Sequence, residues 1–250
     1  MAEYVQNSFD IKYAEAWHKK QGDFSSRLAH GLVEYMKTHN LKINSCLDIC
    51  CGTGEFIDCM KNVIPVCTGN EIAQSMIDYA KTQLPDIKFY YIPEMHKFKV
   101  DQKYDLLTCN HDMVNSLHDK VLWQTFFNTC FGALNKGGHL LFDVYTDEKL
   151  KNWKETIYEQ SRLIDHVRSV SQKDNLCVIN EVYYMIGDEF MEPVVYSKTF
   201  DILIEMGVPT NEILAMLQKA GFRKVEAFDS KMEPLDNIEG KGRIHFWCEK

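Results

Sequence analysis

Ten consecutive residues set the architecture of this chain: Leu47-Asp48-Ile49-Cys50-Cys51-Gly52-Thr53-Gly54-Glu55-Phe56. In this stretch a short apolar run leads into two closely spaced glycines and then into residues that begin a helical pattern. That order predicts a buried strand that turns tightly into a helix. In an open parallel sheet, ligands bind beside such turns because glycines let the backbone approach them closely. We therefore expect a ligand site at Gly52 and Gly54.

Short apolar runs alternate with helical periods on either side of this turn. Such alternation is typical of βαβ units and therefore of a parallel sheet. The strands predicted in this region are Cys46–Cys50, Val66–Glu71, Ile87–Ile92, Tyr104–Asn110 and Leu140–Tyr145, and the helices are Gly54–Asn62, Ser75–Leu84 and Asp119–Leu134. The Asn135-Lys136-Gly137-Gly138 segment is expected to form the turn after the last of these helices.

The two ends of the chain follow other patterns. Residues 8–39 predict two helices, the second capped by Ser25 or Ser26. A helical stretch over Asp147–Thr156 is expected to follow the fifth strand. The segments predicted after it are three antiparallel strands at Leu163–Val170, Leu176–Met185 and Val194–Ile204, a helix at Asn211–Ala220, and two last strands at Lys224–Asp229 and Ile244–Cys248.

Composition and charge exclude several classes of protein. The chain has 250 residues, of which 45% are hydrophobic and 26% are charged, and these are ordinary globular values. Its formal net charge of −8 argues against non-specific binding to nucleic acid. The 9 cysteines are an odd number and lie mostly in apolar runs, which indicates reduced thiols. Without a signal pattern or a long apolar segment, we expect a cytoplasmic protein that does not bind membranes.

An acidic residue follows the glycine turn at a sequence spacing that is typical of ribose-binding sites. Glu71 ends the next predicted strand, 17 residues after Gly54, and an acidic side chain near this spacing can accept hydrogen bonds from ribose hydroxyls. The segment is not a phosphate loop, because it lacks both the Walker pattern and the third glycine of the dinucleotide fingerprint. Glu55 and Asp58 place negative charge in the first helical turn. These features favour a cationic cofactor that carries a ribose.

These segments resemble the motifs of class I S-adenosylmethionine-dependent methyltransferases. The segments that carry the resemblance are Leu47–Gly54, Gly69–Met76, Glu94-Met95, Tyr104–Leu107, Leu134–Gly138 and Leu217–Phe222. Cys50 departs from the family's small Gly or Ala, and Glu94 replaces its commoner Asp. The resemblance implies an α/β fold: a Rossmann-like seven-stranded sheet, mostly parallel, with N-terminal helices and an antiparallel β insert after the fifth strand.

The resemblance also implies a division of the chain. We expect residues 1–250 to form a single methyltransferase domain. Residues 1–39 would be a helical cover, residues 40–146 and 206–250 the Rossmann-like core, and residues 147–205 a β insert on the substrate side.

The cofactor that the resemblance implies is S-adenosyl-L-methionine. Aromatic rings of the N-terminal helices could contact its sulfonium by cation–π attraction. The residues expected to bind the cofactor are Asp48, Cys50, Gly52, Thr53, Gly54, Glu71, Ile72, Met76, Glu94, Met95, Asn110, Tyr13 and Trp17.

Candidates for catalysis follow the fourth and fifth strands. Methyl transfer from a sulfonium is an in-line displacement, so it depends mainly on alignment, and the acceptor must also lose a proton. His111 is the expected general base because an imidazole suits proton removal near neutrality. Asp112, Tyr145, Tyr183 and Tyr196 are the expected substrate contacts. No metal is expected, because the spacing of the nearby His and Asp residues matches no familiar ligand pattern.

The function predicted is methyl transfer to an O or N atom of a small-molecule acceptor. The strand-rich insert resembles that of small-molecule methyltransferases, including those that act on amino groups of nucleotide-linked sugars. Alternatives are a catalytically silent scaffold or a cofactor-sensing partner protein, which would bind the donor without transfer. The chain also contains a Tyr-x-x-x-Lys pattern at 145–149, as in short-chain dehydrogenases, but the glycine fingerprint of those enzymes is missing.

Overall fold

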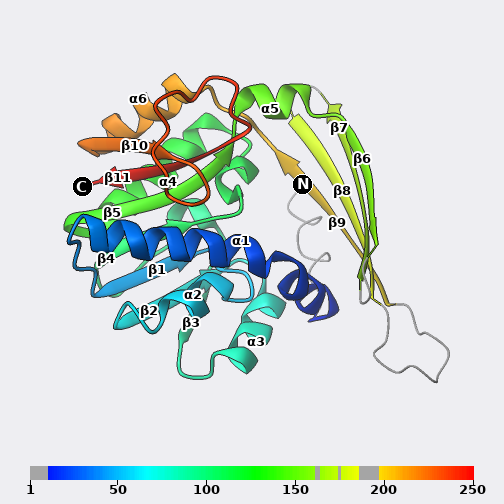
Figure 1. The fold of residues 1–250 in the computed structure, drawn as a ribbon, viewed down its shortest axis with the longest axis horizontal. Helices are drawn as coiled ribbons and strands as arrows, with labels where there is room; N and C mark the ends of the chain where they lie inside the picture. Colours follow the sequence, from blue (N-terminus) through cyan, green and yellow to red (C-terminus); the bar gives the residue numbers. More distant parts are fainter. Residues whose placement is uncertain (1–10, 161–163, 174–175, 186–196) are drawn as a thin grey trace.

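A seven-stranded sheet forms the centre of the computed structural model, which describes residues 11–160, 164–173, 176–185 and 197–250 (Figure 1). The strands, in spatial order, are β10 (Lys224–Phe228), β11 (Arg243–Glu249), β5 (Leu134–Tyr145), β4 (Tyr104–Cys109), β1 (Ser45–Ile49), β2 (Val66–Glu71) and β3 (Lys88–Tyr91). Only β11 runs antiparallel to its neighbours. The predicted α/β fold with a mostly parallel sheet is confirmed.

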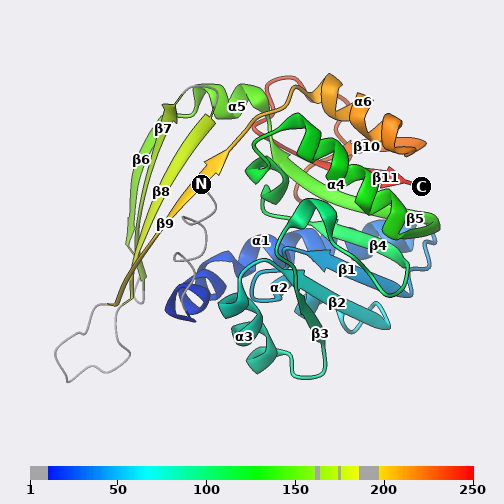
Figure 2. The same cartoon turned by 180° about the vertical axis from the view of Figure 1, so that it is seen from behind.

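Helices cover both faces of this sheet (Figures 1 and 2). One face carries α1 (Ile11–Thr38), α2 (Glu55–Met60) and α3 (Gln74–Gln83), and the other carries α4 (Lys120–Ala133) and α6 (Thr210–Ala220). A short helix α5 (Asp147–Asn152) follows β5, and 3-10 turns occur at η1 (Met95–Lys97) and η2 (Met113–Ser116). No helix in the described ranges combines the length and the apolar character needed to cross a membrane.

A second sheet stands beside the first, as both views show (Figures 1 and 2). It is antiparallel throughout, in the order β6 (Glu155–Gln160), β7 (Ile164–Lys173), β8 (Leu176–Met185) and β9 (Ser197–Glu205). At the end near α5, Trp153, Val170 and Ile179 pack in a small core of their own. The predicted antiparallel insert after the fifth strand is confirmed.

The N-terminal segment differs from its prediction. The described part forms one continuous helix, α1, where two were expected, and Ser25 is buried inside it and caps nothing. A helix tolerates an internal serine pair when tertiary contacts use those side chains. Ser25 contacts His111, so its polarity serves the contact between α1 and the sheet.

The insert and the fifth strand also correct the prediction. β6 was missed because its sequence, Glu-Thr-Ile-Tyr-Glu-Gln, has only two apolar residues, and the helix expected over Asp147–Thr156 ends at Asn152. β5 begins at Leu134, so the segment 135–138 lies in the strand and not in a turn. The other predicted elements lie within one to three residues of the observed ones wherever they are described. Residues 163 and 194–196 of two predicted strands lie outside the described residues.

Gly31 lets α1 pack directly on the loop after β10. A Cβ on Gly31 would lie 2.1 Å from the Lys231 carbonyl oxygen. Gly31→Ala is therefore expected to lower the free energy of unfolding by about 1–3 kcal/mol, although alanine normally favours a helix. Gly132→Ala is the matched control, because that helical glycine has nothing within 4 Å of its Cβ position. Urea unfolding of both variants tests this, and equal stabilisation of the two would contradict it.

All nine cysteines are free thiols, and seven of them are buried. Burial raises the pKa of each thiol, and for Cys67 it reaches about 11. The seven buried cysteines act as small apolar residues in the core.

Candidate active site

The glycine turn lies where the strand order reverses. The chain runs from β1 to β2 and β3 on one side, and β4 then pairs with the other edge of β1. Gly52 (φ 56) and Gly54 (φ 87) take left-handed backbone conformations, and so does Cys50 (φ 54). These angles carry the chain sharply from β1 into α2 and leave the backbone uncovered by side chains. The turn is therefore built as the sequence predicts, at the point where open α/β sheets bind ligands.

Glu71 faces this turn from the end of β2. One carboxylate oxygen accepts a hydrogen bond from the Gly52 N–H at 2.8 Å, and the other accepts from Ile72 and Ala73 at 2.7 and 3.0 Å. Burial raises the pKa of Glu71, and the three backbone bonds oppose that rise. A carboxylate has about four acceptor positions, so Glu71 can hold the turn and still accept from a diol.

Asp48 lies within the sheet beneath the turn. Its carboxylate accepts a hydrogen bond from the Thr108 hydroxyl of β4 at 2.6 Å, and its side chain is almost fully buried. Burial raises the pKa of Asp48 to about 7. Asp48 thus joins β1 to β4 at the edge where their carboxyl ends meet.

The helix α1 reaches the turn with two aromatic side chains. His18 Nδ1 lies 3.1 Å from the Thr53 hydroxyl, which donates to Glu55 at 2.5 Å. The hydrogen bond with Glu55 raises the pKa of His18. The Trp17 indole nitrogen lies 3.6 Å from the position of a Cβ on Gly52. His18 was missed from sequence because only the packing of α1 brings it here.

The remaining predicted cofactor residues have different surroundings. Met76 and Met95 are buried, and Ile72 packs at the border of the core. The Glu94 side chain is 45% exposed and pairs with Lys97 at 2.7 Å. The side chain of Tyr13 lies outside the described residues.

His111 and Asp112 form a tight corner after β4. Both have positive φ values, 60° and 52°, which are uncommon for residues other than glycine. The His111 ring lies between Trp17 and Phe24, with ring centroids 5.6 and 4.5 Å away, and its Nε2 is 3.1 Å from the Ser25 hydroxyl. Burial lowers the pKa of His111 to about 4, so its imidazole is neutral near pH 7.

Arg243 holds this corner from the first residue of β11. Its guanidinium pairs with both Asp112 and Asp143, and it lies 4.1 Å from the centroid of the Tyr145 ring. The Asp112 N–H also donates to Asp143 at 3.1 Å. Burial raises the pKa of Asp143, and the Arg243 charge opposes the rise. Sequence analysis missed Arg243, because only the antiparallel register of β11 places it opposite Tyr145.

Four side chains around this edge have buried polar atoms with no hydrogen-bond partner in the described part of the chain. The atoms are both amide atoms of Asn110, Oδ1 of Asp143, Oε2 of Glu205 and both ring nitrogens of His245. Such atoms are costly to bury, and each calls for an explanation such as a bound group. Asn110 follows β4, Asp143 lies in β5, His245 lies in β11, and Glu205 is the last residue of β9. The four side chains therefore belong to one region of the molecule. This region has the polar capacity of a ligand site.

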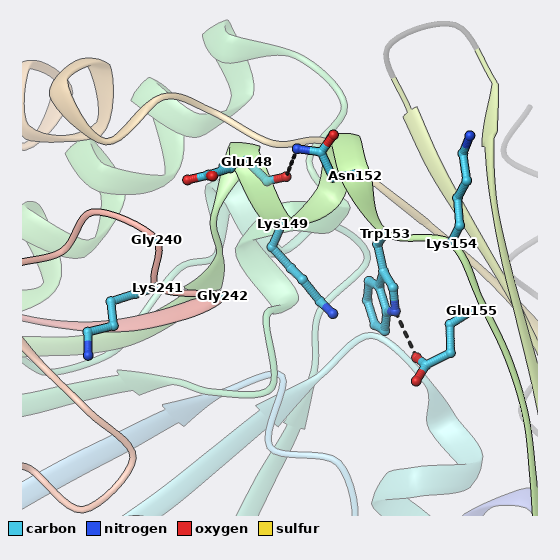
Figure 3. Close-up of a pocket in the computed structure, with 9 residues that line it drawn as sticks. All are labelled: Glu148, Lys149, Asn152, Trp153, Lys154, Glu155, Gly240, Lys241 and Gly242. Carbon is cyan, nitrogen blue, oxygen red and sulfur yellow. Dashed lines mark hydrogen bonds between the residues drawn. The ribbon is translucent and has the colours of Figure 1, made fainter.

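A separate hollow lies beside Trp153. It has a volume of about 370 Å³ between α5 and the 240–242 loop, and the Lys149 side chain reaches into it toward Trp153 (Figure 3). The Lys149 ammonium is 4.3 Å from the Trp153 ring centroid, and Trp153 donates to Glu155 at 2.7 Å. The Trp153 and Tyr145 rings are 4.9 Å apart, so the hollow and the Arg243 cluster share a wall.

Among the residues described, His, Cys, Asp and Glu side chains form no group of three or more that could hold a metal ion. Of the predicted substrate contacts, Asp112 and Tyr145 lie together at Arg243. The Tyr183 side chain and all of Tyr196 lie outside the described residues.

The fold is an open α/β sheet, and the glycine turn lies at the carboxyl end of β1, where the strand order reverses. A family model described as "Methyltransferase domain" matches residues 16–183, which is more than half of the chain. The chain belongs to this family. It is an S-adenosylmethionine-dependent methyltransferase, as the motifs imply.

Individual proteins resemble it at lower identity. The chain is 24% identical over 212 residues to "Putative methyltransferase YqeM" of Bacillus subtilis (strain 168), covering 82% of this chain and 83% of that protein. Over 100 residues it is 25% identical to the dTDP-3-amino-3,6-dideoxy-alpha-D-glucopyranose N,N-dimethyltransferase of Streptomyces fradiae, covering 40% and 39%. An S-adenosylmethionine-dependent methyltransferase of Clostridium acetobutylicum ATCC 824 shares the fold, with a TM-score of 0.81, 17% identity and coverage of 95% and 97%.

Proposed function

We propose that this enzyme transfers a methyl group to an O or N atom of a small-molecule acceptor, and within this class we favour the nitrogen of a sugar-type amine. The gathering of unpartnered polar atoms at the ends of β4 and β9 and in β5 and β11 carries this proposal, since they offer hydrogen bonds to a bound molecule. The name of the Streptomyces fradiae relative, which specifies an amino sugar, supports the choice of acceptor. We also propose a cytoplasmic location, which the free buried thiols favour.

The residues of the turn fit the cofactor. We assign the ribose to Glu71 and the turn backbone to Gly52, Thr53 and Gly54, and we place Asn110 and Trp17 beside the cofactor. When it is bound, S-adenosylmethionine supplies an electrophilic methyl on a sulfonium. The negative charge of Glu71 and Glu55 near this position suits a cation.

The remaining residues align the reactants and exclude water. Trp17 and Phe24 of α1 close over His111, so the reacting region is covered from the helical side. In an in-line displacement, such alignment accounts for much of the rate. His111 can orient a polar group, but its pKa of about 4 makes it a weak base, so its role as general base stays a prediction.

The three-part division of the chain also stays a proposal. We assign residues 147–205 to the acceptor side, because β9 contacts both α1 and η2 beside the site. The hollow next to Tyr145 has room for a part of the acceptor that is remote from the methylated atom.

A direct assay tests the proposed function. S-adenosylhomocysteine binding is measured by calorimetry. Methyl transfer is followed by mass spectrometry with dTDP-3-amino-3,6-dideoxy-α-D-glucose and with its 3-hydroxy counterpart. We expect binding, and a mass gain on the amine. Binding without transfer to either compound would favour a silent scaffold, and absence of binding would overturn the cofactor assignment.

Glu71→Ala is expected to weaken S-adenosylhomocysteine binding by about 1–3 kcal/mol, because it removes a charged hydrogen-bond acceptor. It also frees three backbone N–H groups, so thermal unfolding must show that the variant is folded at the assay temperature. Glu34→Ala is the control, since Glu34 is exposed on α1 and pairs with the exposed Lys37. Calorimetric affinities that are equal for Glu71→Ala and wild type would refute the ribose assignment.

A further inference from the structure

Glu205 is a buried carboxyl at the edge of the candidate site. It is the last residue of β9, where the insert returns to the core, and it is 3% exposed. Its Oε2 has no hydrogen-bond partner within the described ranges. A carboxyl oxygen in such a position is costly unless another group uses it.

The fold fixes Glu205 at the edge that carries His111 and Asp112. The next residue, Met206, donates its N–H to the Asn115 carbonyl at 2.8 Å and accepts from the Asn115 side chain at 3.1 Å. The same Asn115 side chain bonds both backbone groups of Tyr145, at 3.0 and 3.1 Å. One residue therefore ties the end of β9 to the end of β5, and Glu205 is held rigidly beside the site.

The charges near Glu205 do not balance. Arg243 is the cation that acts on it, and this guanidinium already pairs with Asp112 and Asp143. Glu205 is thus a third carboxyl near the Arg243 guanidinium. The other titratable neighbours are Cys177 and Tyr145, which add no positive charge. Burial, and then the adjacent Asp112, raise the pKa of Glu205 well above its usual range, so it binds a proton far more strongly than an exposed glutamate.

The other groups at this edge suit proton transfer less well. His111 is a weak base with a pKa of about 4, and burial raises the pKa of Tyr145 to about 12, so Tyr145 keeps its proton near neutrality. Asp112 and Asp143 are bound to Arg243. A carboxylate with a raised pKa is a stronger proton acceptor, and Glu205 combines a raised pKa with a buried Oε2 that has no hydrogen-bond partner within the described ranges.

We propose that Glu205 accepts the proton that the acceptor amine loses during methyl transfer. The inference rests on the proposed function. An R–NH₃⁺ group gives one proton to the ionised Glu205 and becomes R–NH₂, and Glu205 becomes the neutral acid. The nitrogen lone pair then forms the N–C bond, while the C–S bond of the donor breaks and its electron pair stays on sulfur. The products are the methylated ammonium and S-adenosylhomocysteine, and Glu205 releases its proton to solvent before the next cycle.

The kinetic test compares Glu205→Gln with wild type on dTDP-3-amino-3,6-dideoxy-α-D-glucose. Gln keeps the shape but cannot take the proton, so we expect kcat to fall about 100-fold or more. The wild-type rise of kcat with pH should disappear, while S-adenosylhomocysteine affinity stays within twofold. Glu34→Gln, an exposed change on α1, should match wild type. An unchanged pH profile in Glu205→Gln would overturn the proposal, and so would a wild type that binds S-adenosylhomocysteine but does not methylate this amine. A wild type that fails to bind S-adenosylhomocysteine would instead defeat the proposed function.

A second measurement needs no acceptor. A carboxyl whose pKa is raised by folding contributes its stability below the pKa of the unfolded chain, about 4.3, and loses it as the pH rises through the folded-state pKa. Gln at position 205 does not ionise, so Glu205→Gln removes this loss of stability at high pH. We therefore expect the variant to melt at a higher temperature than wild type at pH 8, with the difference shrinking toward pH 5. A variant that is less stable than wild type at both pH values would show that Glu205 serves the fold, and would overturn the proposal.

Discussion

Replacing Arg243 by methionine is expected to destabilise the protein by about 3–5 kcal/mol, because it leaves Asp112 and Asp143 without their cation in a buried setting. For a chain of this size, that loss corresponds to a fall of roughly 10 °C in the melting temperature. The corner at His111 and Asp112, with its two positive φ values, would also lose the group that holds it. Thermal unfolding at pH 7 measures the effect.

The pH dependence and two further variants test whether the destabilisation of Arg243→Met comes from the unpaired carboxylates. Without Arg243 the pKa of Asp143 would rise further, so the deficit should be largest at pH 8 and should shrink as the pH falls and the carboxyls are protonated. Adding Asp143→Asn to Arg243→Met should restore part of the stability, since it removes one unpaired charge. Arg223→Met, an exposed change just before β10, should have little effect. If Arg243→Met lost no more stability than Arg223→Met, the ion pairs of Arg243 would contribute nothing to the free energy of unfolding.

The second large effect is expected at the glycine turn. Gly52→Val should abolish S-adenosylhomocysteine binding, because a branched side chain would occupy the space between the turn and Trp17 that we assign to the cofactor. Gly52 also has a φ of 56°, a conformation that a valine adopts only under strain. Calorimetry should show at least a 100-fold loss of affinity, about 2.7 kcal/mol.

Gly137→Val is the control that distinguishes the two effects of Gly52→Val, which are backbone strain and loss of the space for the cofactor. Gly137 has a similar φ of 74° and nothing within 4 Å of its Cβ position. Valine there imposes a comparable backbone strain far from the turn, so it should lower stability and leave the affinity unchanged. If both variants bound normally, the cofactor could not lie against Gly52.

The parts of the fold that follow from local sequence were predictable. Apolar runs set β1, β2 and β4, and the paired glycines with Glu71 marked the turn, because strand, turn and acidic partner all lie within 25 residues of sequence. β6 was missed because an exposed strand in a separate sheet needs few apolar residues. α1 was divided in two because Ser25 looked like a cap, when its partner is in fact His111.

The acidic cluster could not be found in the same way. Arg243, Asp143 and Glu205 come from three strands that are far apart in the sequence, and the contacts arise from the register of β11 and the return of β9. Short sequence motifs identify residues that lie close together in the sequence and act within one turn. Ion pairs between distant strands leave no such trace, so only the three-dimensional arrangement identifies them.

The buried thiols have a practical consequence for handling this protein. Thiolates, and not thiols, react with alkylating reagents. Since burial keeps the thiols protonated, iodoacetamide should modify the folded chain slowly, and first at Cys59, the exposed cysteine. The other cysteines would react only when their surroundings open. Two of them, Cys50 and Cys51, lie in the glycine turn itself. If S-adenosylhomocysteine slows the alkylation of these two cysteines by iodoacetamide, the rate at each one would measure how far the ligand occupies the turn.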